Sequence, residues 1–160
     1  MKEISIQNDG RKIFVDNEDY IRLSQYKWYL IESNGSEQII TTKWNQDTQQ
    51  TESINIGRVV LQVDSTVDHK DINPFNNQKY NLRKATRSQN NCNKKKYGVL
   101  LSSMYKGVTR RKRSQYESRI TINKKTIGLG RFKSAVEAAK AYNEAALKYH
   151  GEFAYLNKLP

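Results

Sequence analysis

The chain has little cysteine and no long apolar run, and both absences narrow what it can be. Cys92 is the one cysteine among 160 residues, which excludes an internal disulfide and a zinc cluster built on several thiolates. No stretch approaches the roughly eighteen apolar residues that a membrane-spanning helix needs. Residues Met1–Ile6 lack the apolar segment of a signal peptide, so we expect no secretory signal. These absences fit a reducing, intracellular compartment, and we expect no membrane partner.

Acidic residues are nearly absent from residues 83–133, which hold 16 Lys and Arg and one Glu, a net charge of +15. Residues 1–60 carry −2, residues 61–82 carry −1 and residues 134–160 are neutral, so this block accounts for the excess positive charge of the whole chain. Such a block indicates a phosphate-binding surface. The alternatives are a solvated basic face, an acidic protein partner or an RNA partner.

What the chain does contain is a polar run, Val67–Asn93, that combines residues able to do chemistry. Asp68 precedes His69, Asn81 follows that histidine by twelve positions, and Asn90 follows Asn81 by nine. A histidine with a pKa near 6.5 can take a proton from water, and a hard divalent cation prefers carboxylate and amide oxygens. The two together suit phosphodiester hydrolysis. Alternatively, the asparagines are ordinary turn residues and His69 is a surface histidine.

The local pattern also predicts how these residues meet. On an extended segment, Asp68 and His69 point to opposite faces, so one can bind metal while the other faces water. Thr86 and Gln89 fit a capping box, which predicts a helix that begins at about Arg87. A strand, loop, strand and helix would then bring Asp68 and Asn90 together.

This run resembles the HNH endonucleases, the ββα-metal nucleases common among phage homing enzymes. The resemblance rests on Asp68-His69, Asn81-Leu82-Arg83 and Asn90. It implies that His69 is the general base and that Asn81 pins the loop by hydrogen bonds. It also implies that Asp68 and Asn90 ligate one divalent ion, Mg²⁺ or Mn²⁺.

One departure from that family concerns the segment upstream of the motif. Relatives carry a Leu-His-Arg-like segment where this chain has Ile56-Gly57-Arg58, so the histidine is missing. This departure supports a competing hypothesis, a non-catalytic DNA-binding protein or regulator derived from such an enzyme. Against it, a decayed site has no chemical reason to keep the aspartate, the histidine and both asparagines.

The first part of the chain is expected to be rich in short strands. We expect strands at Lys2–Gln7, Arg11–Val15, Lys27–Ile31, Gln38–Lys43 and Ser53–Leu61, and a helical turn over Tyr20–Gln25. A polar stretch, Trp44–Thr51, separates the last two strands, and Ser33-Asn34-Gly35 is a turn. The run from Asp16 to Tyr29 resembles the region that precedes the nuclease motif in phage proteins. We expect a packing role for it, with a DNA-backbone contact as a second option.

Residues 94–104 have the composition of a linker. Lys94, Lys95 and Lys96 are followed by Gly98 and two serines. This composition indicates a mobile basic tether that tracks along DNA.

The last third is expected to form three strands and a helix. The strands are Tyr105–Arg111, Tyr116–Ile122 and Thr126–Phe132. In the second strand Tyr116, Ser118, Ile120 and Ile122 share one side, and Glu117, Arg119 and Thr121 share the other. Ser134 and Glu137 form a capping box, which predicts a helix to about Tyr149 with Gly151 just beyond it. Alanines in this helix allow it to pack closely on a sheet.

This last third resembles the plant APETALA2/ethylene-response-factor DNA-binding domain. The resemblance rests on Tyr105-Lys106-Gly107-Val108, Ile127–Phe132 and Glu137–Ala146. In that family the sheet lies in the DNA major groove. By position, the reading face here would be Thr109, Arg111, Arg113, Arg119 and Thr121. Arg113 and Gly128 replace family tryptophans and Arg119 replaces a glutamate, so the plant recognition sequence does not transfer.

The sequence therefore predicts an α+β protein with a β-rich HNH endonuclease domain at 1–93 (motif 67–93), a basic linker at 94–104 and an APETALA2-like domain at 105–160. The expected function is sequence-directed, metal-dependent cleavage of double-stranded DNA, by nicking or double-strand cutting, as a monomer. The expected place of action is the cytoplasm of a bacterial or phage-infected host cell. Further DNA contacts are expected from basic residues next to the motif, in the linker and in the basic turn, namely Arg83, Arg87, Lys94, Lys95, Lys96 and Arg110.

Overall fold

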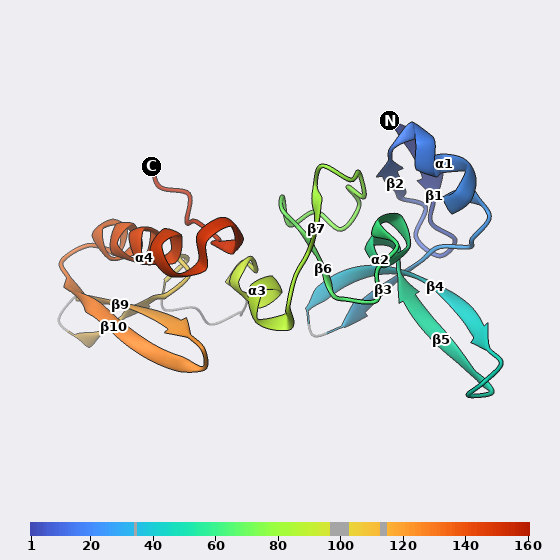
Figure 1. Ribbon diagram of the computed structural model, residues 1–160. Helices are drawn as coiled ribbons and strands as arrows, with labels where there is room; N and C mark the ends of the chain where they lie inside the picture. Colours follow the sequence, from blue (N-terminus) through green and yellow to red (C-terminus); the bar gives the residue numbers. More distant parts are fainter. Residues whose placement is uncertain (34, 97–102, 113–114) are drawn as a thin grey trace. The chain divides into compact units, whose positions relative to one another are not determined.

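The computed structural model describes residues 1–33, 35–96, 103–112 and 115–160, and it divides the chain into two compact units, Met1–Arg87 and Ser88–Pro160 (Figure 1). Within the described residues the protein is mixed α+β, with four small antiparallel sheets and four α-helices. The predicted α+β class is confirmed. Asn34 of the expected turn, residues 97–102 of the expected linker and Arg113 of the expected reading face lie outside the described residues.

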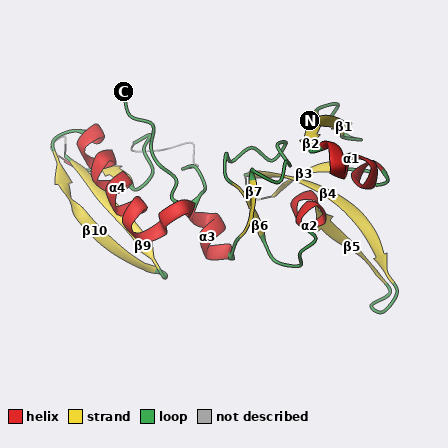
Figure 2. Ribbon diagram, turned by 45° about the horizontal axis from the view of Figure 1, so that its top comes forward, coloured by secondary structure: helices red, strands yellow, loops and turns green. Residues whose placement is uncertain are grey.

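The first unit contains two sheets and two helices around one core, and a further strand pair. Its elements are β1 (Lys2–Ser5), β2 (Lys12–Val15), α1 (Asn17–Ser24), β3 (Tyr29–Ser33), β4 (Ser36–Asn45), β5 (Gln50–Asn55), α2 (Ile56–Leu61), β6 (Val67–His69) and β7 (Leu82–Lys84). β1 pairs with β2, β3-β4-β5 form a meander, and β6 pairs with β7 (Figure 2). Ile13, Leu23, Trp28 and Ile56 lie in the buried core. The unit is held together by apolar side chains from nearly every element.

The strand predicted over Ser53–Leu61 is wrong in its second half. β5 ends at Asn55, and Ile56 begins the helix α2. The Asn55 side chain accepts a hydrogen bond from the Gly57 N–H at 2.9 Å, which satisfies one of the donors that a helix start leaves unpaired. Ile56 and Val60, one helical turn apart, are both buried. The predicted polar break is also shorter than expected, because β4 continues to Asn45 and β5 begins at Gln50.

The second unit is a three-stranded antiparallel sheet with a long helix on one face (Figures 1 and 2). Its elements are β8 (Val108–Arg110), β9 (Tyr116–Ile122), β10 (Lys125–Phe132), α4 (Ala135–His150) and a 3-10 turn (Gly151–Phe153), and α3 (Arg87–Cys92) begins at its boundary. The sheet order is β10-β9-β8. β8 is shorter than the predicted Tyr105–Arg111, while the predicted β9 is confirmed.

Small residues allow α4 to lie close to this sheet. Ser134 and Glu137 form the predicted capping box, which is confirmed, and Ala138, Ala139 and Ala146 of α4 are fully buried. Gly107 has a positive φ of +76°, and a Cβ there would lie 2.0 Å from Cδ2 of the Tyr142 ring. Only glycine fits this position. The alternation predicted for β9 is confirmed, since Ser118 and Ile120 are buried while Arg119 and Thr121 are exposed.

Candidate functional site

The pairing of β6 with β7 positions the Asp68-His69 pair. In this antiparallel register Asp68 lies opposite Arg83 and His69 lies opposite Leu82 (green in Figure 1). The Asp68 carboxylate is buried, and its Oδ2 lies 2.8 Å from Arg83 Nε and 2.7 Å from the terminal guanidinium nitrogen. The two side chains are 4% and 11% exposed. A buried carboxylate needs such a partner, because an unpaired charge is costly inside a protein.

His69 is half-buried and hydrogen-bonded at one ring nitrogen. Its Nε2 lies 3.0 Å from Oδ1 of Asn77. Burial lowers the pKa of His69 below its ordinary value, although the Asn77 hydrogen bond and the charges of Asp71 and Asp68 act in the opposite direction. The neutral imidazole is therefore favoured, which is the form that can accept a proton.

Asn81 connects both ends of the loop between these strands. Its Nδ2 donates to Asp71 Oδ1 at 2.9 Å and to the Asn76 carbonyl at 2.8 Å, and its Oδ1 accepts from the Asp71 N–H at 3.1 Å. The side chain is buried. Three hydrogen bonds from one buried amide keep the loop in a single conformation beside His69.

The N-terminal hairpin and helix hold the same loop from its other side, which the sequence did not reveal. The Phe14 N–H donates to the Phe75 carbonyl, and the Asn77 N–H donates to the Phe14 carbonyl, both at 2.8 Å. The Asp16 carboxylate accepts from the Lys79 N–H at 2.8 Å and from Gln78 Nε2 at 3.1 Å. The resemblance over Asp16–Tyr29 indicated a packing role for this region. The contacts of Phe14 and Asn77 follow no periodic pattern in the sequence.

Gly57 allows α2 to approach the strand that carries Asp68. A Cβ at this position would lie 2.9 Å from Val67 Cγ1 and 3.2 Å from Asn55 Oδ1. Both are closer than side-chain carbons normally come, and the branched Val67 side chain has little freedom to move. In this arrangement a histidine at position 57 does not fit without displacing Val67, the neighbour of Asp68.

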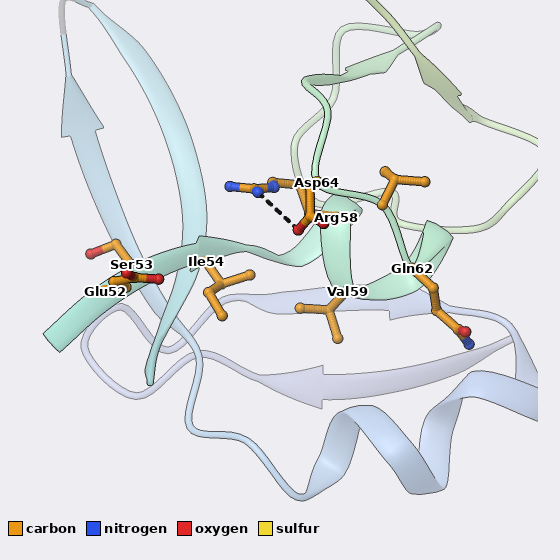
Figure 3. A pocket seen from close by; sticks show the side chains of 8 residues that line it. Glu52, Ser53, Ile54, Arg58, Val59, Gln62 and Asp64 are labelled. Atoms are coloured by element: carbon orange, nitrogen blue, oxygen red, sulfur yellow. Dashed lines mark hydrogen bonds and ion pairs between the residues drawn. The ribbon is translucent and has the colours of Figure 1, made fainter. Parts of the chain in front are cut away.

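A pocket of about 240 Å³ lies between β5 and α2, away from these residues (Figure 3). Arg58 and Asp64 meet across it at 3.4 Å. Glu52 adds a second carboxylate to its lining. None of the residues proposed for the site lines this pocket, so it does not help to define the site.

The helix α3 begins at Arg87, as predicted, and carries Asn90. Arg87 is exposed and Asn90 is half-buried. Within the second unit, the Lys106 ammonium holds the end of this helix, donating to the carbonyls of Cys92 at 2.6 Å and Lys94 at 2.7 Å. Burial lowers the pKa of Lys106 to about 8. The compact-unit boundary falls between Arg87 and Ser88, so the pairing of Asn90 with Asp68 stays a prediction.

The three lysines of the basic run differ in their surroundings. Lys95 is exposed, whereas Lys94 and Lys96 are half-buried. The Lys96 ammonium donates to the carbonyls of Ser103 at 2.9 Å and Val108 at 2.8 Å, and burial lowers its pKa. Lys96 therefore has a structural contact in addition to any role towards phosphate.

The face of the second unit's sheet opposite α4 gathers charged side chains around Glu117. Its carboxylate accepts from Arg119 at 2.9 Å and from Arg111 Nε at 2.7 Å. These hydrogen bonds, that from Arg119 first, hold the pKa of the Glu117 carboxyl below its ordinary value. Thr109 and Arg131 lie opposite Glu117 on the neighbouring strands. One carboxylate thus orients two arginines on an otherwise cationic face.

The remaining predicted contacts of this face are placed as follows. Thr121 Oγ1 lies 3.1 Å from Thr126 Oγ1, and Arg110 is exposed at the end of β8.

Among the residues that the structure describes, no group of three or more His, Cys, Asp or Glu could hold a metal ion. None of the helices in the described ranges is long and apolar enough to cross a membrane.

Comparison with known proteins finds relatives of two kinds. No family model matches the chain. An uncharacterized HNH endonuclease of Acanthamoeba polyphaga mimivirus is 33% identical over 150 residues, which cover 94% of this chain and 76% of the viral protein. The APETALA2-like protein 2 of Oryza sativa, in both the indica and japonica subspecies, is 43% identical over 61 residues, which cover 37% of this chain and 14% of the plant protein.

Proposed function

Because the chain belongs to the HNH endonuclease family, we propose that it hydrolyses phosphodiester bonds of double-stranded DNA at the site around β6 and β7. The observation that carries this proposal is the half-buried His69 next in sequence to the buried Asp68–Arg83 ion pair, where burial lowers the pKa of the imidazole. His69 is the general base that takes a proton from the attacking water. Such a base must be unprotonated at working pH, and burial favours that state.

The proposed metal site uses oxygen ligands. Asp68 supplies a carboxylate that Arg83 already orients, and Asn90 supplies an amide oxygen. This donor set fits one hard divalent ion, Mg²⁺ or Mn²⁺. When bound, the ion supplies positive charge that offsets the charge developing on the phosphate. Arg83 acts on Asp68 in this arrangement, and a direct phosphate contact from Arg83 stays a prediction.

Asn81 has a positioning role in this proposal. Its three hydrogen bonds within the loop fix the backbone on which His69 depends. Because the base is already oriented, the reaction does not have to restrict its conformation, which would cost entropy.

DNA binding is assigned to the basic second unit. Its sheet resembles the APETALA2-type module, and Arg111 and Arg119 are oriented by Glu117 on the face away from α4. Arginine is suited to both guanine edges and phosphates. Thr109, Arg110, Arg113 and Thr121 complete the proposed reading face, while Arg87, Lys94, Lys95 and Lys96 supply phosphate contacts. This module would direct the cut, as in a homing endonuclease that acts as a monomer.

The domain boundaries and the place of action complete the proposal. The nuclease domain spans residues 1–93, a basic linker spans 94–104, and the DNA-binding domain spans 105–160. The resemblance to phage enzymes favours the cytoplasm of a bacterial or phage-infected host cell.

A second candidate function is favoured by Gly57. A non-catalytic DNA-binding protein would keep the basic sheet and lose the cutting, and the histidine of relatives is missing at position 57. Against it, a Cβ at position 57 would lie 2.9 Å from Val67 Cγ1, so the packing of α2 on β6 suits the glycine.

Cleavage of supercoiled plasmid separates the two functions. The wild type is incubated with Mg²⁺ or Mn²⁺ beside His69→Ala, with a chelator control. His150→Gln is a matched control, because His150 is the other histidine of the chain. The proposal expects open-circle or linear product from the wild type and His150→Gln, and a loss on the order of 100-fold or more for His69→Ala. DNA binding without cutting by any of them would favour the second function, and equal cutting by His69→Ala would remove His69 as the base.

A further inference from the structure

Asn77 is a fully buried polar residue in the loop between β6 and β7, and no motif in the sequence marks it. Its backbone N–H donates to the Phe14 carbonyl at 2.8 Å. Its side-chain Nδ2 donates to the Pro74 carbonyl at 2.9 Å, and its Oδ1 lies 3.0 Å from Nε2 of His69. Both ends of this amide therefore have defined partners, and one of them is the proposed base.

The chemistry of the partners fixes the direction of each hydrogen bond. A carbonyl oxygen only accepts, so the amide nitrogen of Asn77 must face Pro74. Its oxygen then faces His69, and since that oxygen also only accepts, the proton must be on His69 Nε2. A neutral imidazole carries one ring proton, which leaves the lone pair on Nδ1.

We propose that Asn77 is a positioning residue that holds His69 in the Nε2–H tautomer and makes Nδ1 the atom that accepts the proton. This inference rests on the proposed role of His69 as general base. As the water oxygen bonds to phosphorus, one water proton moves to Nδ1. The bond from phosphorus to the leaving sugar oxygen breaks with its electron pair on that oxygen, which takes a proton from solvent. The imidazolium then returns its extra proton to solvent.

The first hairpin takes part in this arrangement through its backbone. Phe14 of β2 accepts from the Asn77 N–H and donates to the Phe75 carbonyl. It thereby fixes the main chain on both sides of Asn76. The orientation of the base depends on a strand outside the motif that carries the catalytic residues.

The test combines a tautomer measurement with kinetics on the full-length protein. Asn77→Leu removes both side-chain hydrogen bonds at similar volume, and Asn77→Asp keeps an acceptor for Nε2–H. Asn73→Ala is the matched control, because this exposed asparagine shares the loop and its Oδ1 accepts from the Phe75 N–H at 3.1 Å. Nitrogen-15 NMR of histidine-labelled, metal-free protein identifies the protonated ring nitrogen, and His69→Gln assigns the signals.

The wild type, Asn73→Ala and Asn77→Asp are expected to show the Nε2–H tautomer of His69, whereas Asn77→Leu shows a mixture. In plasmid cleavage with Mg²⁺, kcat of Asn77→Leu falls about 10- to 100-fold with KM within twofold, and Asn77→Asp recovers most of the loss. Should Asn77→Leu not fold, Asn77→Asp still decides, because a switch of its tautomer to Nδ1–H would overturn the inference.

The failures of the inference and of the proposed function look different. A wild type that cuts DNA, with an Asn77→Leu variant that keeps both the tautomer and kcat, overturns the inference alone. An equal loss of kcat in Asn73→Ala and Asn77→Leu also overturns it, since loop packing would then explain both. A wild type that binds DNA and never cuts it overturns the proposed function and the positioning role together.

Discussion

The loop around His69 and the sheet face around Glu117 hold their functional groups by opposite means. In the loop, the buried neutral amides of Asn77 and Asn81 donate hydrogen bonds to backbone carbonyls. On the sheet, one carboxylate gathers two long, exposed cations, Arg111 and Arg119. The loop is suited to holding one side chain in a fixed position. On the sheet, the arginines can leave the carboxylate and bind the groups of a ligand instead.

A lost interaction is expected to cost more free energy in the loop than on the sheet. A buried donor or acceptor that loses its partner costs about 1–3 kcal/mol, because water cannot replace the bond. An exposed ion pair contributes about 0–1 kcal/mol, because water and salt screen it. Substitutions in the loop should therefore disturb stability and catalysis together, while those on the sheet should change DNA binding with little effect on folding.

The largest effect is expected for Asn81→Ala. The change removes three hydrogen bonds and leaves the Asp71 N–H and the Asn76 carbonyl without this partner. We expect a loss of about 2–3 kcal/mol of unfolding free energy and about 100-fold or more of cleavage activity. Thermal unfolding and plasmid cleavage measure the two. Asn73→Ala, in the same loop but exposed, should lose less than about 1 kcal/mol, and equal losses would contradict the contrast between buried and exposed amides.

A somewhat smaller effect is expected for Gly57→Ala. The new Cβ would lie 2.9 Å from Val67 Cγ1, so β6 must shift next to Asp68. Overpacking of this kind costs about 1–3 kcal/mol, and we expect cleavage to fall with it. Gly128→Ala is the control for stability, because a Cβ there meets nothing within 4 Å. If adding a side chain at position 57 raised activity, as restoration of the family histidine would suggest, the tight packing of α2 on β6 would not be what this site requires.

The pH dependence of stability tests whether burial matters in the second unit as well. Burial lowers the pKa of Lys106 from 10.5 to about 8 in the folded chain. Between these values the unfolded chain holds a proton that the folded chain has released, so this group makes the unfolding free energy rise with pH from about 8 to 10.5. Below pH 8 both states are protonated and the full burial cost applies.

Chemical denaturation across this pH range should show a rise on the order of 1 kcal/mol in the wild type that Lys106→Met lacks. Lys140→Met, an exposed lysine on α4, should keep the rise. A wild-type curve that stays parallel to that of Lys106→Met would show that the buried ammonium is not desolvated.

The smallest effect on folding is expected for Glu117→Gln. We expect stability close to that of the wild type, since Arg111 and Arg119 are exposed and water screens their ion pairs with the carboxylate. Affinity for arbitrary DNA should rise severalfold, because one repelling charge is lost and two arginines are released towards phosphate. The dependence of affinity on salt should steepen by up to about one ion.

Glu144→Gln provides the matched loss of one charge on the exposed side of α4. Fluorescence anisotropy at several salt concentrations measures both variants. An equal rise in affinity for the two variants would show that Glu117 acts on DNA binding only through its charge. A strong loss of stability in Glu117→Gln would contradict the contrast between the sheet and the loop.

Much of the second unit could be predicted because its sequence signals are local. The alternation of β9 shows directly which side chains face α4, and the Ser134–Glu137 capping box marks the start of the helix. Charge can also be counted locally in the sequence, but the contacts that each charged side chain makes cannot. Lys96 and Lys106 belong to the basic block, yet both are half-buried and bonded to carbonyls, because a count of charges contains no information on burial.

The first unit was harder to predict because its key contacts are distant in the chain. The apolar run from Ile54 to Leu61 fits a strand or a helix equally well, and the Asn55 cap and the packing of Ile56 decide for the helix. Asp68, His69 and Asn81 could be proposed as site residues from the sequence because they stand at recognisable spacings. Asn77 could not be proposed in this way, since its contacts are with Pro74, Phe14 and His69, and no sequence spacing marks them.

The Asp16 contacts have a consequence for how the chain becomes active. They join residues 62 and 63 positions apart, so the loop between β6 and β7 gains these contacts only when the beginning of the first unit is in place. Contacts of such separation form late, because closing a long segment costs entropy before any bond rewards it. For protein engineering, residues 67–93 moved alone would lack the contacts of Phe14 and Asp16, which are encoded far upstream.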